Sequence, residues 1–188
     1  LGFLYADGCV SPKTTNIELA LAIKDLKHIE KFIKFVNHEG QINVNEVRAR
    51  VGFRDKQMHS DLIKQGCLPN KSLIIQFPTE EQVPKHLIKH FVRGFLDGDG
   101  YIGMHTNGFG RIGITCGSKQ FIDDLVLKMN WRKNKIHKDE RSKALNIEWA
   151  GYYVCDMLTD LYENSSVYLD RKYEKYIEIK NAVLSRIS

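Results

Sequence analysis

The clearest pattern of hydrophobic and polar positions is the strict alternation in EVRARVGFR, residues 46–54. In an extended chain the two faces would carry different residues: Val47, Ala49, Val51 and Phe53 on one, Arg48, Arg50 and Arg54 on the other. This period of two predicts a strand with a buried face. Solvated faces usually mix both signs of charge, so a basic face with no acidic neighbour indicates a surface for phosphates and guanine edges.

Other segments show the hydrophobic periodicity that is typical of a strand or of an amphipathic helix. Weaker alternation predicts strands at 15–24, with Lys24 on the polar side, and at 110–118, with Arg111 on the polar side. Apolar residues at helical spacing predict amphipathic helices at 26–36 and 119–129. A further helix is expected from Pro84 to Leu96, since proline suits the first turn of a helix.

The chain also repeats itself on the scale of a whole domain. LGFLYADG at 1–8 matches RGFLDGDG at 93–100 with an offset of 92, and the predicted elements follow in the same order in both halves. Near the end of each half Leu68 matches Leu169 and Lys71 matches Lys172, at an offset of 101. We therefore expect two related domains, 1–78 and 79–188. Residues 84–92 have no counterpart before residue 1, so the first motif helix is expected to be short or incomplete.

Each repeated motif places small residues four apart on one helix face. These are Gly2 and Ala6 in the first copy and Gly94 and Gly98 in the second, a spacing that allows two helix backbones to approach closely. Gly8 and Gly100 suit the left-handed position that ends many helices.

An aspartate then falls in the last turn of each motif helix. Asp7 and Asp99 would lie among unpaired carbonyls, where a carboxylate is disfavoured unless a cation binds. One Asp-Gly pair at a helix end is usually only a turn, and DGDG at 97–100 fails as a calcium loop because Gly108 stands where a glutamate is needed. Two copies on adjacent helices predict an all-oxygen site of the kind that Mg²⁺ prefers.

Composition narrows the choice of partners. Of 188 residues, 43% are hydrophobic and 27% are charged, which is ordinary for a folded domain, and the net charge of +5 allows a nucleic acid or another anionic partner. Further basic residues gather in 131–143: Lys133, Lys135, Lys138 and Arg141. The four cysteines are far apart, with no C-x-x-C pair, so a zinc knuckle and a dithiol redox motif are excluded and reduced thiols are expected. No segment has the length and apolarity of a membrane span or a signal peptide, and the lack of an initial Met suggests a trimmed N-terminus.

The two motifs resemble the signature helices of LAGLIDADG homing endonucleases, in the single-chain form with two motifs. The resemblance implies an α+β fold of two pseudo-symmetric αββαββα halves, with the motif helices at the central interface and two saddle-shaped antiparallel sheets over DNA. It also implies a monomer that cuts both strands of a long asymmetric site with divalent metal. That metal would be Mg²⁺, as two or more ions, with Mn²⁺ able to substitute.

The same resemblance assigns roles to single residues. Asp7 and Asp99 match the metal-binding acidic positions, with the backbone carbonyls of Ala6 and Gly98 as supporting ligands. Asp97 matches a motif position that does not bind metal, and Tyr5 stands there in the first copy. Lys71 and Lys172 match basic residues near the scissile phosphates, where they would offset charge and help to polarise water. Asp25 and Ser118 fall near a position that orders the attacking water.

Other activities remain open on the sequence. The same scaffold serves RNA maturases, whose partner is intron RNA, and DNA-binding regulators that do not cleave, although regulators usually lack the acidic residues. The chain could also be the endonuclease part of an intein. An intracellular location is expected, without a compartment, and the target sequence cannot be read from side chains alone.

Overall fold

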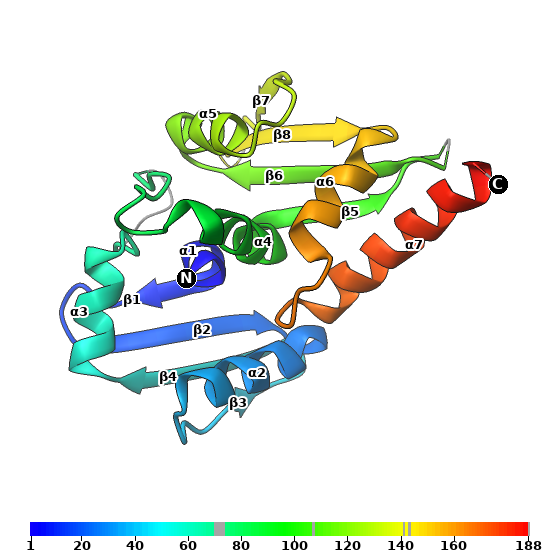
Figure 1. Ribbon diagram of the computed structural model, residues 1–188. Coiled ribbons are helices and arrows are strands. Elements are labelled where there is room, and N and C mark those ends of the chain that lie inside the picture. Colours follow the sequence, from blue (N-terminus) through cyan, green and yellow to red (C-terminus); the bar gives the residue numbers. More distant parts are fainter. Residues whose placement is uncertain (70–73, 107, 141, 143, 188) are drawn as a thin grey trace.

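The computed structural model describes residues 1–69, 74–106, 108–140, 142 and 144–187. It contains two four-stranded antiparallel sheets, one on each side of a central pair of helices (Figure 1). The first sheet has the order β1-β2-β4-β3, made of Gly8–Val10, Asn16–Ala22, Arg48–Arg54 and Asn43–Val44. The second has the order β5-β6-β8-β7, made of Gly100–Met104, Gly110–Cys116, Leu145–Ala150 and Ile136–Lys138. The predicted fold class is confirmed.

The helices complete an αββαββα order in each half. The first half contains α1 (Gly2–Asp7), the 3₁₀ helix η1 (Ile23–Asp25), α2 (Leu26–Val36) and α3 (Lys56–Lys64). The second contains η3 (Lys85–Leu87), α4 (Ile88–Asp99), α5 (Lys119–Lys128) and α6 (Tyr153–Tyr162). A long C-terminal helix, α7 (Asp170–Ile187), follows and was not expected from the repeat. No helix of the described residues is long and apolar enough to cross a membrane.

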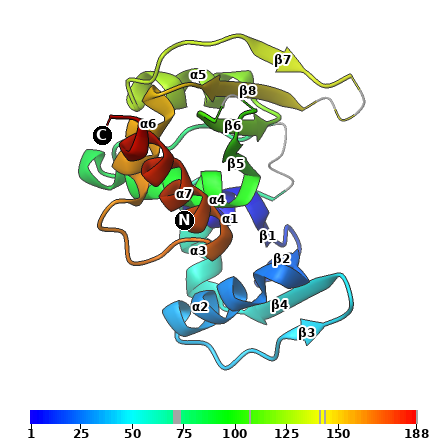
Figure 2. The ribbon, with the colours of Figure 1, turned by 90° about the vertical axis from the view of Figure 1, so that its right-hand side faces the viewer.

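The two sheets keep the same register relative to the motifs. Gly8 pairs with Leu19 across β1 and β2, and Gly100 pairs with Ile114 across β5 and β6. Turned by 90°, the sheets lie at opposite ends of the molecule with α1 and α4 between them (Figure 2). The predicted boundary after residue 78 falls in the connection between α3 and η3 and stays a prediction.

The alternation of apolar residues and arginines along β4 gives the strand one buried face and one exposed face. Ala49, Val51 and Phe53 are buried against the helices, whereas the arginines between them are exposed. The predicted burial of Val47 is wrong: it precedes the strand and is 68% exposed. Strand β2 likewise ends at Ala22, so Lys24 lies in η1 and not on the sheet face.

Gly8 and Gly100, which follow the motif helices, do not adopt the left-handed conformation that the sequence predicted. Gly8 (φ −78°) and Gly100 (φ −99°) are extended, so the left-handed prediction is wrong. Each helix passes directly into a strand at this point, which brings the glycine against the preceding turn. A Cβ would lie 2.6 Å from the Leu4 carbonyl oxygen at Gly8, and 2.4 Å from that of Leu96 at Gly100. Lack of a side chain, and not left-handed geometry, is what these positions require.

Candidate functional site

The central helices approach each other through the small residues of the motifs. A Cβ added to Gly2 would lie 1.9 Å from a backbone carbonyl oxygen of α4, and one added to Gly94 would lie 2.8 Å from a backbone nitrogen of α1. At the other end of the pair, a Cβ on Gly98 would lie 2.3 Å from the Cβ of Ala6. Heavy atoms do not approach so closely, so the predicted interface of Gly2, Ala6, Gly94 and Gly98 lies where the sequence placed it. As expected, α1 is short, with 6 residues against 12 in α4.

This close packing brings the two motif aspartates to one place. Asp7 and Asp99 are the last residues of α1 and α4. A Cβ on Gly98 would lie 2.9 Å from Oδ2 of Asp7, so the carboxylate of one helix lies against the C-terminal turn of the other. Helix C-termini carry partial negative charge on their free carbonyls, which adds to the charge of the carboxylates. The result is a concentrated negative potential lined by oxygen atoms.

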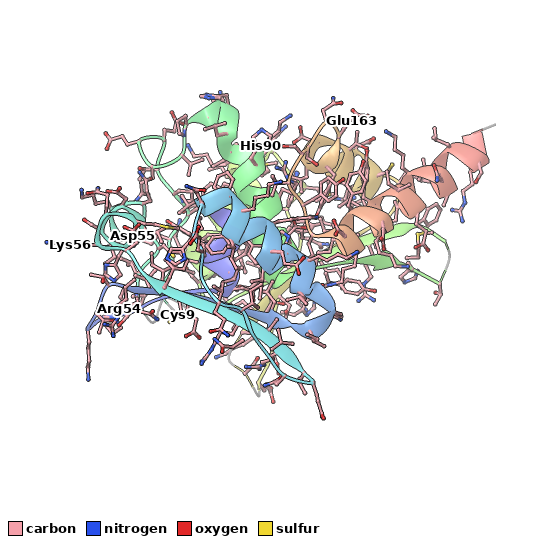
Figure 3. The ribbon with its side chains drawn as sticks, turned by 90° about the horizontal axis from the view of Figure 1, so that it is seen from below. Cys9, Arg54, Asp55, Lys56, His90 and Glu163 are labelled. Atoms are coloured by element: carbon pink, nitrogen blue, oxygen red, sulfur yellow. The ribbon has the colours of Figure 1, made fainter. Side chains whose placement is uncertain are left out.

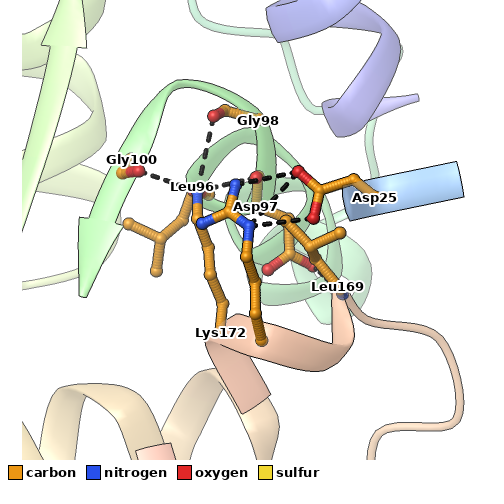
Figure 4. A network of polar contacts seen from close by, with 8 residues as sticks. Asp25, Leu96, Asp97, Gly98, Gly100, Leu169 and Lys172 are labelled. Carbon is orange, nitrogen blue, oxygen red and sulfur yellow. Dashed lines mark hydrogen bonds and ion pairs between the residues drawn. The ribbon is translucent and has the colours of Figure 1, made fainter. Parts of the chain in front are cut away.

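Lys172 lies beneath this site and is almost completely buried, with 2% of its surface exposed. Its Nζ, with three N–H donors, lies within hydrogen-bond distance of four carbonyl oxygens around the end of α4: those of Leu96 (2.5 Å), Asp97 (2.6 Å), Gly98 (3.3 Å) and Gly100 (2.7 Å) (Figure 4). The ammonium group therefore caps the helix that carries Asp99. The predicted role of Lys172 near the scissile phosphates stays a prediction, and its counterpart Lys71 lies outside the described residues.

The pKa of Lys172 reflects two opposing effects. Burial lowers it from 10.5 to about 8, while the negative charges of Asp97, Asp7 and Asp99 act in the opposite direction. A buried cation of this kind offsets the negative potential of the helix end.

Asp97 is held inside the second half. It accepts hydrogen bonds from the hydroxyl of Tyr162 at 2.5 Å and from the backbone N–H of Leu169 at 3.0 Å. Burial raises its pKa from 3.8 to about 6. At the matching position of the first half, Tyr5 donates to the carbonyl oxygen of Gln65 at 2.5 Å. In both halves this position ties the motif helix to the chain that follows the last short helix, a role consistent with the expectation that Asp97 does not bind metal.

Asp25 joins the two halves. Its carboxylate accepts from Arg171 Nε at 2.9 Å and Nη2 at 3.1 Å, and Lys31 on α2 forms a second ion pair with Asp170. Sequence reasoning missed this role of Arg171, which stands beside the motif lysine in DRK at 170–172. Ser118, the other residue expected to order water, caps α5 by accepting from the Phe121 N–H at 3.2 Å. The proposed water-ordering roles stay predictions.

The basic strand face is exposed as expected, with one correction. Arg48, Arg50 and Arg54 all point to solvent from β4. Arg50 nevertheless has an acidic neighbour, because Glu18 on the adjacent strand lies 3.7 Å away. Arg54 and Cys9 lie on the opposite side of the molecule from His90 and Glu163 (Figure 3).

The remaining predicted nucleic-acid contacts differ in their surroundings. Arg111 on β6 forms an ion pair with Glu148 on β8 at 2.5 Å, so its charge is largely offset. Lys133, Lys135 and Lys138 are exposed in and before β7, as is Lys24 in η1. Arg141 lies outside the described residues.

One cavity is separate from the carboxylate pair, since neither Asp7 nor Asp99 lines it. It has a volume of about 1300 Å³ and lies between α1, α2, α3 and α4, with Phe35, Met58 and His90 among its lining residues. A cavity of about 210 Å³ lies beside Asp99, next to Thr115 and Cys116 of β6. Among the described residues, no three His, Cys, Asp or Glu side chains form a metal-binding cluster.

Comparisons with known proteins show what the sequence and the fold are similar to. The chain matches no protein-family model. One curated relative, the probable translation initiation factor IF-2 of Methanocaldococcus jannaschii, is 26% identical over 141 residues, which cover 67% of this chain and only 11% of that protein.

Solved structures match over nearly the whole length. The I-SmaMI meganuclease bound to uncleavable DNA has a TM-score of 0.63 at 14% identity, covering 99% of this chain and 89% of its own. The LAGLIDADG meganuclease I-AabMI bound to uncleaved DNA has a TM-score of 0.63 at 11% sequence identity, and the match covers 98% of this chain and 90% of I-AabMI. The LAGLIDADG homing endonuclease I-GzeII in complex with its DNA target has a TM-score of 0.63 at 13% sequence identity, and the match covers 99% of this chain and 90% of I-GzeII. This chain therefore has the two-domain fold of the LAGLIDADG homing endonucleases.

Proposed function

We propose that the protein is a site-specific double-strand DNA endonuclease that requires a divalent metal ion. The observation that carries the proposal is the convergence of Asp7 and Asp99 at the ends of two helices packed in direct contact, between two sheets with exposed outer faces. The solved structures of similar fold are DNA complexes, which supports the same substrate. One chain supplies both carboxylates, so a monomer suffices.

The donor set suits Mg²⁺. The two carboxylates offer hard oxygen ligands, and so do the backbone carbonyls of Ala6 and Gly98 that we propose as supporting ligands, although the Gly98 carbonyl also accepts from Lys172 at 3.3 Å. Mg²⁺ commonly binds through one or two carboxylates and takes its other ligands from water and substrate phosphates. A site of this kind needs no cluster of three acidic, His or Cys side chains. I-SmaMI has been solved on uncleaved DNA in the presence of calcium ions, which supports divalent metal at this fold. We propose two or more Mg²⁺ ions, replaceable by Mn²⁺.

The residues of the chain hold the reacting groups in place. When bound, the divalent metal supplies Lewis-acid activation of water and stabilises charge on the phosphate oxygens. Asp7 and Asp99 would hold it where the two halves meet. Lys172 fixes the carbonyls around Asp99 and thereby the direction of that carboxylate. The separation of the two aspartates is set by the small residues of the interface.

The strands supply binding to the duplex. A β-ribbon or sheet fits the major groove of B-DNA, where side chains reach the base edges. Arg48, Arg50 and Arg54 present guanidinium groups on one such surface, and the lysines around β7 present charges for phosphates on the other. Phosphate contacts fix register and base contacts give specificity.

The test is cleavage of a randomised duplex library by the purified protein in Mg²⁺ and in Ca²⁺, beside Asp7→Asn and Asp99→Asn. We expect Mg²⁺-dependent double-strand cuts at one long sequence, lost in either variant while duplex binding in Ca²⁺ persists. Lys34→Asn, an exposed change on α2, is the matched control and should cut normally. Binding without cutting would support the regulator, and tighter binding to structured intron RNA than to any duplex would support the maturase.

The curated match favours a second proposal about the setting of the module. The similar segment makes up 11% of a protein named for translation initiation, a different activity. We propose that this chain is the endonuclease part of an intein and is carried inside a host protein. Expression of a complete host reading frame, followed by intact-mass measurement, should then show a spliced host product and a released module. A single unspliced product would contradict this setting.

A further inference from the structure

The two sheets place unlike side chains at equivalent positions. Because Gly8 and Gly100 occupy the same place in each half, their strand partners Leu19 and Ile114 are equivalent. Leu19 pairs in turn with Val51, and Ile114 with Ile147. Strand β4 therefore matches β8 residue by residue, at an offset of 96.

This equivalence shows that the row of arginines on β4 is not repeated on β8, although Arg111 on β6 and the lysines in and before β7 are basic residues of the second half. On the outward face, Arg48, Arg50, Gly52 and Arg54 of β4 correspond to Ala144, Asn146, Glu148 and Ala150 in and beside β8. None of the three arginines has a basic equivalent. The duplication has kept the backbone and changed the chemistry that faces outward.

The charge balance of the two faces differs for the same reason. Of the three arginines of β4, Arg50 forms an ion pair, with 3.7 Å between its Nη1 and Glu18 Oε1. The side chains of Arg48 and Arg54 form no ion pair with any other described residue. On the second face, Arg111 and Glu148 neutralise each other at 2.5 Å. Thr115 donates to Asn146 Oδ1 at 2.6 Å, so that face carries one uncharged polar pair together with the Arg111–Glu148 ion pair.

The spacing of the arginines suits the spacing of base pairs. Alternate residues on an antiparallel strand are about 6.8 Å apart, which is about two steps of B-DNA at 3.4 Å each. Arg48 and Arg50 would reach positions two base pairs apart. Gly52 has no side chain to reach the next pair of base-pair steps, and Arg54 would reach the base pair after that. The β2 residues directly opposite Arg50 and Arg48 are Ala20 and Ala22, which are small, whereas Glu18 on the same strand forms the ion pair with Arg50.

We propose that the DNA target is chemically divided, with a guanine-rich half-site under the first sheet and a half-site of adenine and cytosine contacts under the second. An arginine fork binds O6 and N7 of guanine, whereas asparagine suits adenine and glutamate accepts from cytosine. Arg48, Arg50 and Arg54 read the first half-site; Asn146 and Glu148 read the second. The proposal rests on the endonuclease function proposed above and names its substrate more closely.

The experiment is selection of duplexes from a randomised library in Ca²⁺, followed by sequencing, with residues exchanged between equivalent positions. Arg50→Asn gives the first sheet the residue of the second, and Asn146→Arg does the reverse. Both side chains lie on the sheet surface, that of Arg50 with 59% exposure, so both variants should melt as the parent does. We expect Arg50→Asn to bind the parent site about 5- to 150-fold more weakly and to change one guanine to adenine. Asn146→Arg should gain a guanine in the other half-site, and Lys34→Asn should change neither.

The outcomes separate the two proposals. If the parent protein enriches no sequence, or the enriched sequence is not cut in Mg²⁺, the endonuclease function itself is wrong. If a long site is enriched and cut but G·C pairs are equally frequent at the contacted positions of both half-sites, only the divided target is wrong. Unchanged base preference in Arg50→Asn would refute the assignment of that arginine in the same way.

Discussion

Replacing Gly98 with alanine tests whether the close helix pair controls the reaction. The new Cβ would lie 2.3 Å from the Cβ of Ala6. Carbon atoms in contact are about 3.5–4.0 Å apart, so the helices must separate by about 1 Å or more at this end. Overpacking of this kind costs about 1–3 kcal/mol, and the better helix propensity of alanine returns about 1 kcal/mol. We expect a net loss of up to about 2 kcal/mol in the free energy of unfolding.

The effect on cleavage should exceed the effect on stability. The helices carry Asp7 and Asp99, and a misplacement of about 1 Å in a reacting centre can reduce a rate about 100-fold. Urea unfolding followed by circular dichroism gives the first quantity, and single-turnover cleavage in Mg²⁺ gives the second. Adding Ala6→Gly removes the atom that is struck, so the double variant should be more stable than Gly98→Ala alone and regain part of its rate. A Gly98→Ala protein with parental stability and rate would show that the helices are not packed this closely.

Three further predictions concern the buried polar contacts. Lys172→Met removes the donor to the carbonyls at the end of α4 and should lower stability by about 1–3 kcal/mol in urea unfolding. Burial raises the pKa of Asp97 from 3.8 to about 6, so its contribution to stability is present below pH 3.8 and is lost as the pH rises through 6. Asp97→Asn does not titrate, so its stability relative to the parent should improve on the order of 1–3 kcal/mol between pH 4 and 7 in the same assay; no change would refute the shift. A double-mutant cycle of Asp25→Asn and Arg171→Ala should give about 1 kcal/mol of coupling, reduced by salt because Arg171 is 44% exposed.

Local patterns anticipated most of the elements. The period of two in 48–54 gave β4, and helical spacing gave α2 and α5 to within a residue or two. The spacing of Gly2, Ala6, Gly94 and Gly98 gave the interface. These predictions succeeded because each depends on side chains within one or two turns or a few strand residues. Helix α7 was missed because its first residues were read as the end of the repeat, which has no such helix in the first half.

Long-range partners were beyond local patterns. Arg171 pairs with Asp25 across 146 residues, and Lys172 reaches the end of α4 across about 75. Glu18 lies beside Arg50 only because β2 and β4 are neighbours in the sheet. No spacing along the chain encodes these contacts, since they arise when separate elements pack.

The sequence by itself determined the duplicated architecture, the helix pair and the positions of Asp7 and Asp99 at the helix ends, because the repeat and the periodicity are properties of the chain. Only the tertiary structure decided that Lys172 is a buried helix cap, that Gly8 and Gly100 are extended, and that the arginines of one sheet have no basic equivalents in the other. The sequence shows a lysine in the same way whether it is buried or exposed, and a glycine in the same way whether its backbone is extended or left-handed. The role of either residue depends on which atoms the folded chain brings within a few ångströms of it.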